Sequence, residues 1–89
     1  MIPNTIRARL QTALAPVSLS IEDDSLLHAG HAGASAGAGH YRVRIVSARF
    51  QGLSRVARHR LVYDPLSDLM PAQIHALAVQ ALTPEESAS

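Results

Sequence analysis

The sequence predicts an α+β domain in which a three-stranded mixed sheet has its helices packed on one face. Three patterns predict this class: an amphipathic stripe at the N-terminus, two segments of alternating apolar and polar residues, and an apolar run over residues 74–82. The resulting element order is αββααβ, with one more short helix at the C-terminus. At 89 residues the chain is expected to form a single domain, residues 1–89.

The first half contains a helix and two strands. Over residues 2–14 apolar residues recur at spacings of three and four, with Pro3 in the expected first turn. At residues 17–22 Val, Leu and Ile alternate with Ser and Glu, and at residues 41–45 Tyr, Val and Ile alternate with Arg. This period of two is typical of strands with one buried face. We expect the two strands to be antiparallel neighbours.

The middle of the second half is predicted to be helical. Ser54 is a suitable N-cap for a helix over residues 55–63. Asp64 and Pro65 are expected to stop this helix, because proline disfavours helical backbone at the residue before it. The same two residues are expected to begin a short second helix, with Asp64 as N-cap and Pro65 in its first position.

Residues 74–82, IHALAVQAL, allow either a strand or a helix by length, and their alanines favour helix locally. We predict a strand, because a sheet needs a third member to be stable. Residues 83–86 then form a capping box with Pro84 in the first helical position. Few residues follow, so this last helix is expected to add little.

Composition excludes several classes of protein. The chain is 47% hydrophobic and 17% charged, as in ordinary globular domains. It has no apolar run of about 18 residues and no signal-peptide pattern, so we expect a cytoplasmic protein without a membrane partner. It has no cysteine, and therefore no disulfide and no thiolate ligand of its own. Without a nucleophile elbow, a P-loop or a dinucleotide motif, no enzyme is expected.

The charges are unevenly distributed. All basic residues are arginine, six of them lie between residues 42 and 60, and no acidic residue falls between Asp24 and Asp64. A basic middle suggests an anionic partner, either nucleic acid or an acidic protein face, although a solvated charged surface explains it equally well. On the helix over residues 55–63, Arg55, Arg58 and His59 are expected to point mostly outward, away from the apolar positions. The candidate nucleic-acid or partner surface comprises Arg49, Arg55, Arg58, His59 and Arg60.

The histidines are the candidate metal ligands. His28, His31 and His40 lie in residues 26–40, a Gly- and Ala-rich segment without periodicity that we expect to be a flexible loop. A closed zinc site needs four ligands, so polar spacers in a linker are the simpler interpretation of these imidazoles. His75 follows one residue into the third strand, on the face of Leu77 and Val79 or at its rim. Either a backbone carbonyl satisfies it, or it is a rim ligand for a metal that another molecule also holds.

Residues 40–86, HYRVRIVSARFQGLSRVARHRLVYDPLSDLMPAQIHALAVQALTPEE, resemble the BolA family, and the likeness extends upstream through IEDDSLLHAGH, residues 21–31. The motifs are specific in combination: H-Y/F-x-V-x-I-V-S, F-x-G, R-H-R-x-V-Y and I/V-H-A-L. The resemblance implies a class II KH-like fold with topology αββααβ, the order read independently from periodicity.

The resemblance also implies a non-enzymatic partner of monothiol glutaredoxins. Such a pair shares a [2Fe–2S] cluster, to which the glutaredoxin gives a cysteine, glutathione a thiolate and the BolA-like protein imidazole. The family's C-terminal ligand matches His75, and the loop ligand matches His28, with His31 as the alternative. The protein would hold no cofactor alone, would be a monomer or weak dimer when free, and would serve cluster storage, transfer or iron and redox sensing.

The family's second association is DNA binding and transcriptional regulation, including stress response. Here the arginine-rich helix over 55–63 would provide the contact surface, because arginine suits both phosphate and guanine. The G-x-x-G loop with which KH domains bind RNA has no counterpart in residues 40–89, the half of the chain that holds the arginine-rich helix. DNA binding is therefore the second hypothesis.

Overall fold

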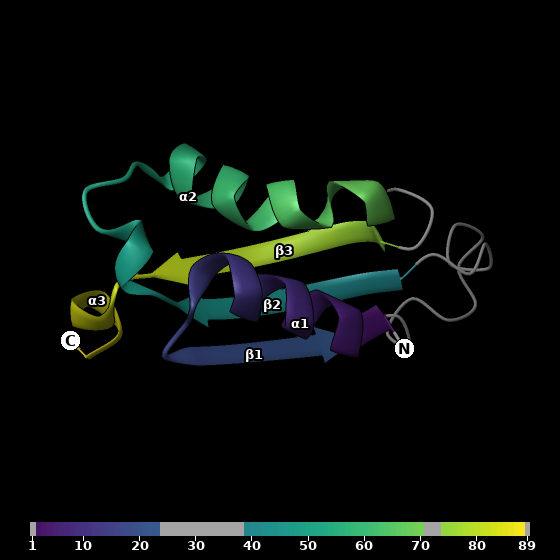
Figure 1. Ribbon diagram of the computed structural model, residues 1–89, viewed down its shortest axis with the longest axis horizontal. Coiled ribbons are helices and arrows are strands. Elements are labelled where there is room, and N and C mark those ends of the chain that lie inside the picture. The colour runs from purple at the N-terminus through teal and green to yellow at the C-terminus, as the bar shows by residue number, and fades with distance from the viewer. Residues whose placement is uncertain (1, 24–38, 71–73, 89) are drawn as a thin grey trace.

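The computed structural model describes residues 2–23, 39–70 and 74–88 (Figure 1), and at His75 it describes the backbone alone. The order of elements confirms the predicted α+β class and αββααβ(α) topology. The elements are α1 (Ile2–Leu14), β1 (Ser18–Asp23), β2 (Gly39–Val46), the 3-10 helix η3 (Ala48–Phe50), α2 (Arg55–Tyr63), the 3-10 helix η4 (Asp64–Leu69), β3 (Ile74–Leu82) and α3 (Pro84–Ala88).

The sheet has the strand order β1-β2-β3. β1 is antiparallel to β2 and β2 is parallel to β3, so the sheet is mixed, as predicted. β2 begins at Gly39, which places the last two residues of the expected loop, residues 26–40, in the strand. Residues 24–38 lie outside the described part of the chain.

One hydrophobic core lies between the sheet and its helices. Alternate side chains of β2 face this core: Tyr41, Val43 and Ile45 are buried, whereas Arg42 faces solvent. The third strand forms over residues 74–82 despite its alanines, because burial against the helices outweighs local propensity. The buried core residues are Ile6, Leu10, Leu14, Tyr41, Val43, Ile45, Phe50, Val62, Leu66, Leu69 and Ile74.

Polar side chains from the helices reach backbone carbonyls at both edges of the sheet. On the β1 edge, Arg7 Nη1 donates to Leu19 O at 3.2 Å. On the β3 edge, Tyr63 Oη donates to Leu77 O at 2.9 Å and Arg58 Nη1 donates to Ala81 O at 3.1 Å. These bonds tie the helices to backbone carbonyls of the two outer strands, β1 and β3.

The junction between α2 and η4 differs from the prediction. Ser54 caps α2 as expected, accepting from Ala57 N at 3.1 Å, and α2 ends at Tyr63. Asp64, however, keeps helical backbone (φ −55°, ψ −47°) and does not act as an N-cap. Pro65 has no N–H to continue the α-helical ladder, so the chain tightens into a 3-10 helix without a break.

The C-terminal helix α3 anchors the end of the sheet, and the expectation that it adds little is wrong. The predicted capping box forms: Glu86 N donates to Thr83 Oγ1 at 3.2 Å, and Thr83 N donates to Glu86 Oε1 at 2.8 Å. Glu86 also pairs with Arg58 of α2 at 2.6 Å. These hydrogen bonds, first from Arg58 and then from Thr83, lower the pKa of Glu86 to about 2.

Ser47, at the end of β2, joins three elements. Its side chain is fully buried, donates to Leu14 O at the end of α1 at 2.7 Å, and accepts from Arg49 N at 3.2 Å. Its backbone N–H donates to Leu82 O at the end of β3 at 2.9 Å. Figure 1 shows α3 at this same end of the sheet, where β2 and β3 finish.

Candidate functional site

The opposite end of the sheet brings two histidine positions together. β2 and β3 are parallel, so both strands start at this end. Gly39 pairs with Ile74 and His40 pairs with Ala76, and the register shift between them leaves His75 as an extra residue on β3. Such a register shift is a bulge-type irregularity, a feature that proteins often place beside functional sites.

The bulge has a cause in the hydrophobic pattern. Ile74 is fully buried, and Leu77 and Val79 also pack against the core. Ile74 and Leu77 are three residues apart, so strict alternation along β3 would place them on opposite faces. One extra residue at His75 lets both face the core. The sequence prediction placed His75 on the face of Leu77 and Val79, or at its rim, by regular alternation, whereas the register of β3 against β2 shifts at this residue.

The segment that carries the other candidate ligands joins this same end of the sheet. His28 and His31 lie outside the described residues, and the chain from them enters β2 at Gly39. Because Gly39 pairs with Ile74, the residue where this segment ends is adjacent to the residue before His75. His40 is the first residue of β2 beyond the register shift.

Tyr41 lies against Gly39 at the start of β2. A Cβ atom placed on Gly39 would be 2.1 Å from Tyr41 Cε2, so the ring occupies the space that any other residue at 39 would need. The ring is 7% exposed. Burial raises the pKa of the Tyr41 hydroxyl, and the negative charge of Asp23, its partner on β1, raises it further. Sequence reasoning missed this contact, although a glycine two residues before an aromatic in a strand is a usable signal.

The candidate metal ligands of this chain are imidazoles, since the sequence has no cysteine. In the described ranges, no group of three or more His, Cys, Asp or Glu side chains comes together to hold a metal ion. Imidazole is a good ligand for iron, and in Rieske-type clusters histidines replace the cysteines of one iron. An imidazole at position 75 is therefore a chemically suitable iron ligand.

The residues of the candidate nucleic-acid or partner surface differ in their exposure to solvent. Arg49, Arg55 and Arg60 are exposed. The Arg58 side chain is 15% exposed and was wrongly expected to point outward. It donates to Leu53 O and Ala81 O at 3.1 Å each, in addition to its pair with Glu86. Helical periodicity cannot anticipate this, because the carboxylate belongs to a helix 28 residues further along the chain.

His59 and Arg55 line a groove between α2 and β3. His59 is half-buried and its ring meets the Tyr63 ring edge-to-face at 6.2 Å. A cavity of about 330 Å³ includes Arg55 and His59, and a neighbouring cavity of about 430 Å³ includes Arg55 and Arg58. Arg55 and His59 therefore lie beside β3.

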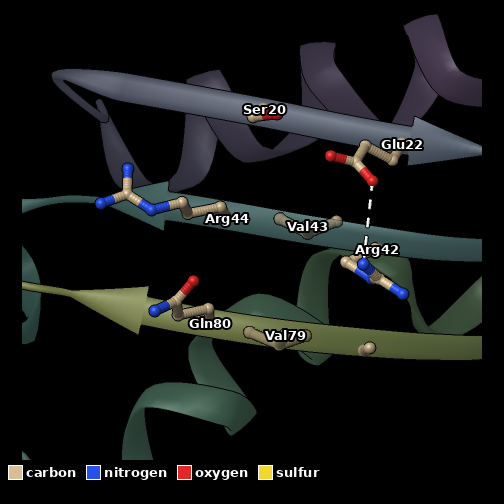
Figure 2. Close-up of a pocket in the computed structure, with 8 residues that line it drawn as sticks. Ser20, Glu22, Arg42, Val43, Arg44, Val79 and Gln80 are labelled. Carbon is tan, nitrogen blue, oxygen red and sulfur yellow. Dashed lines mark ion pairs between the residues drawn. The ribbon is translucent and has the colours of Figure 1, made fainter.

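The face of the sheet opposite the core carries a shallow pocket of about 290 Å³ (Figure 2). Figure 2 shows the side chains of Arg42 and Arg44 diverging along β2, with Glu22 directed toward Arg42. The Arg42–Glu22 pair is 3.9 Å long, and both side chains are about 60% exposed. Solvent screens such a pair, so it contributes little to stability.

None of the helices in the described ranges is both long enough and apolar enough to cross a membrane.

Comparisons with known proteins agree on one family. The family model described as BolA-like protein matches residues 10–86. SufE-like protein 1, chloroplastic/mitochondrial, from Arabidopsis thaliana is 49% identical over 86 residues, which cover 91% of this chain and 23% of that protein. The solved BolA domain of SufE1 from Arabidopsis thaliana is similar with a TM-score of 0.83 and 47% identity, covering 96% of this chain and 94% of that domain.

Two further relatives are similar over most of this chain. BolA-like protein 1 from Mus musculus is 46% identical over 81 residues, covering 91% of this chain and 57% of that protein. The DNA-binding transcriptional regulator BolA from Vibrio cholerae is 38% identical over 86 residues, covering 97% of this chain and 78% of that protein. The chain thus spans about half of the mouse relative and about a quarter of the SufE-like relative. The chain belongs to the BolA-like protein family.

Proposed function

We propose that this protein is a non-enzymatic partner of a monothiol glutaredoxin, with which it shares a [2Fe–2S] cluster for storage, transfer or iron and redox sensing. Its membership of the BolA-like family supports the proposal. In this account His75 supplies one imidazole, and His28 or His31 supplies another. The cluster, when bound, contributes its redox and transfer chemistry, and the thiolates come from the glutaredoxin and glutathione.

The β-bulge at His75 is the observation that carries the proposal. It sets one histidine apart from the regular pairing of β3, at the end of the sheet where the histidine-bearing segment enters β2. The first described residue after the segment that carries His28 and His31 is Gly39, which pairs with Ile74, the residue before His75. A chain that has no cysteine also depends on a partner to complete an iron–sulfur centre.

The test is to add the protein to a cluster-loaded monothiol glutaredoxin in the presence of glutathione and to record visible absorption and circular dichroism. We expect the wild-type protein to change both spectra, and His75→Ala to abolish the change. Val17→Ala alters an exposed side chain at the end of the sheet where β2 finishes, and serves as the control. No spectral change with the wild type, or an equal loss with Val17→Ala, would contradict the proposal.

A second pair of variants decides whether His28 or His31 is the other proposed ligand. His28→Ala and His31→Ala are compared in the same assay, and the one that carries the ligand should lose most of the spectral change. His40→Ala, at the start of β2, is expected to retain it. A loss confined to His40→Ala would move the second ligand from the loop to the strand.

DNA binding is the second candidate function, because the Vibrio cholerae relative is named a DNA-binding transcriptional regulator. Arg49, Arg55 and Arg60 are the exposed cations for phosphate contacts. Under this alternative, binding falls with salt in proportion to the phosphate contacts made, weakens in Arg55→Gln/Arg60→Gln, and is unaffected by His75→Ala. Arg58 is unsuitable for this test, since its removal would also release Glu86.

The cytoplasmic location stays a prediction, since SufE-like protein 1 is named as chloroplastic and mitochondrial.

A further inference from the structure

We propose that Tyr41 is a positioning residue for the candidate metal centre. Its ring, packed on Gly39, holds β2 and β3 in the bulged register and thereby fixes the backbone at His75. The functional part of this inference rests on the proposed cluster-sharing function. The structural part concerns the protein alone and is testable without any metal.

The contact between Tyr41 and Gly39 is closer than any other residue at position 39 would allow. A Cβ atom on Gly39 would lie 2.1 Å from Tyr41 Cε2, 2.4 Å from Cζ and 2.5 Å from Oη. All three distances are far below van der Waals contact. The ring therefore lies back along the strand over Gly39, toward the end of the sheet where β2 and β3 start.

The pairing of β2 with β3 gives this contact its significance. Gly39 pairs with Ile74, the residue before the bulge, and Tyr41 pairs with Leu77, beyond it. The ring thus joins two β2 residues whose partners lie on opposite sides of His75. Ile74 and Tyr41 also belong to the same buried cluster, so the contact is held from both strands.

A bulged register needs such support. Regular pairing from Gly39 onward would shift β3 by one residue, and a shift of one residue turns every following side chain to the other face. Beyond Leu77, the residues of β3 that pack against the core oppose a shift of register. At the start of the strand, the burial of Ile74 and the packing of the Tyr41 ring on Gly39 are contacts that oppose it. Loss of the ring contact is therefore expected to loosen the backbone at His75 first.

Four variants separate this role from general stability. Gly39→Ala displaces the ring without altering Tyr41, Tyr41→Ala removes the ring, and Tyr41→Phe keeps the ring and removes the hydroxyl. Val43→Ala is the matched control, because Val43 is fully buried on the same strand and face, two residues further from the bulge. The thermal midpoint of each variant is measured, so that all comparisons are made on folded protein.

The first measurement uses the protein alone: amide NMR shifts and hydrogen exchange at His75 and Ala76. We expect Gly39→Ala and Tyr41→Ala to shift both amides and accelerate their exchange, whereas Tyr41→Phe and Val43→Ala leave them as in the wild type. The second measurement is the visible circular dichroism of the complex with cluster-loaded glutaredoxin. There, Gly39→Ala and Tyr41→Ala should weaken cluster sharing by about 10-fold or more, the usual effect of losing a group that orients a ligand.

Equal effects of Val43→Ala and Gly39→Ala at His75 would overturn the inference, because the role would then be general packing. Equal loss in Tyr41→Phe and Tyr41→Ala would also overturn it, because the hydroxyl rather than the ring would be responsible. If the wild type shares no cluster, the proposed function fails, and the amide measurements still decide the structural claim.

Discussion

The two ends of the β2–β3 pair are built on different principles. Where the strands finish, Ser47 bonds to α1 and β3, and Thr83, Glu86 and Arg58 join α3 to α2. Where the strands start, the register shifts at His75 and the Tyr41 ring packs on Gly39. Among the described residues, the finishing end is joined by a set of hydrogen bonds between elements, whereas the starting end carries the register shift with apolar packing beside it.

This difference indicates that a domain of this size can place its stabilising hydrogen bonds and its candidate ligand at different ends of the sheet. Small domains bury limited surface and have little stability to lose. Concentrating hydrogen bonds at one end allows irregular backbone at the other, where binding segments are usually drawn from the less stable part of a fold. His75 belongs to the irregular end. The predictions below test whether the two ends are independent.

The largest stability effect is expected from Ser47→Ala. The substitution leaves the buried Leu14 carbonyl without its 2.7 Å donor and removes the acceptor of the Arg49 N–H. Leaving a buried polar group without a partner costs about 1–3 kcal/mol of unfolding free energy, and each kcal/mol lowers the thermal midpoint by roughly 4–8 °C in a domain of this size. Calorimetry measures the shift. A midpoint equal to the wild type would show that Ser47 does not join these elements.

Low pH is expected to weaken the contacts of Glu86 at the end of the sheet where β2 and β3 finish. The folded-state pKa of Glu86 is about 2, lowered by Arg58 and Thr83 from an ordinary value of 4.5. Because the folded pKa is the lower one, this contribution is complete above about pH 5 and is lost as the pH falls toward 2. Glu86→Gln should therefore flatten the acid limb of a stability-against-pH curve. An unchanged limb would mean that the Arg58–Glu86 pair does not form in solution.

The smallest effect is expected at the end of α1. Ala15 has a positive φ of 43°, and its N–H donates to Gln11 O at 3.1 Å, as in the left-handed caps that favour glycine. Ala15→Gly relieves about 1 kcal/mol of strain and loses part of that gain through the freer unfolded chain. Denaturant titration should show a small increase in stability. A decrease would indicate that Ala15 is not strained.

Much of the fold was predictable from local patterns. The bounds of α2, the Ser54 cap and the capping box at Thr83 depend on neighbouring residues, and all three predictions are confirmed. The strand over residues 74–82 was predicted from the needs of the sheet rather than from its alanines. What escaped prediction depends on distant partners: Arg58 turns inward toward Glu86, and Asp64 stays helical because η4 follows directly.

In the candidate site, too, features set by neighbouring residues were predictable and features set by distant partners were not. The position of His75 in β3 followed from the strand predicted over residues 74–82. Its ligand role came from the family motif and stays a prediction. The bulge was hidden, because it arises from the pairing of Ile74 with Gly39 across the fold. The role of Gly39 was equally hidden, since only the placement of the Tyr41 ring shows why a side chain there is not tolerated.

The most direct test of the account compares one variant from each end in the cluster-sharing assay. Wild type, His75→Ala and Ser47→Ala are each added to cluster-loaded monothiol glutaredoxin with glutathione, at a temperature where all three are folded, and visible circular dichroism is recorded. The account predicts the wild-type spectrum for Ser47→Ala and no spectral change for His75→Ala, whose thermal midpoint stays near the wild-type value. A wild-type spectrum for His75→Ala, or its loss in folded Ser47→Ala, would contradict the separation of function and stability between the two ends.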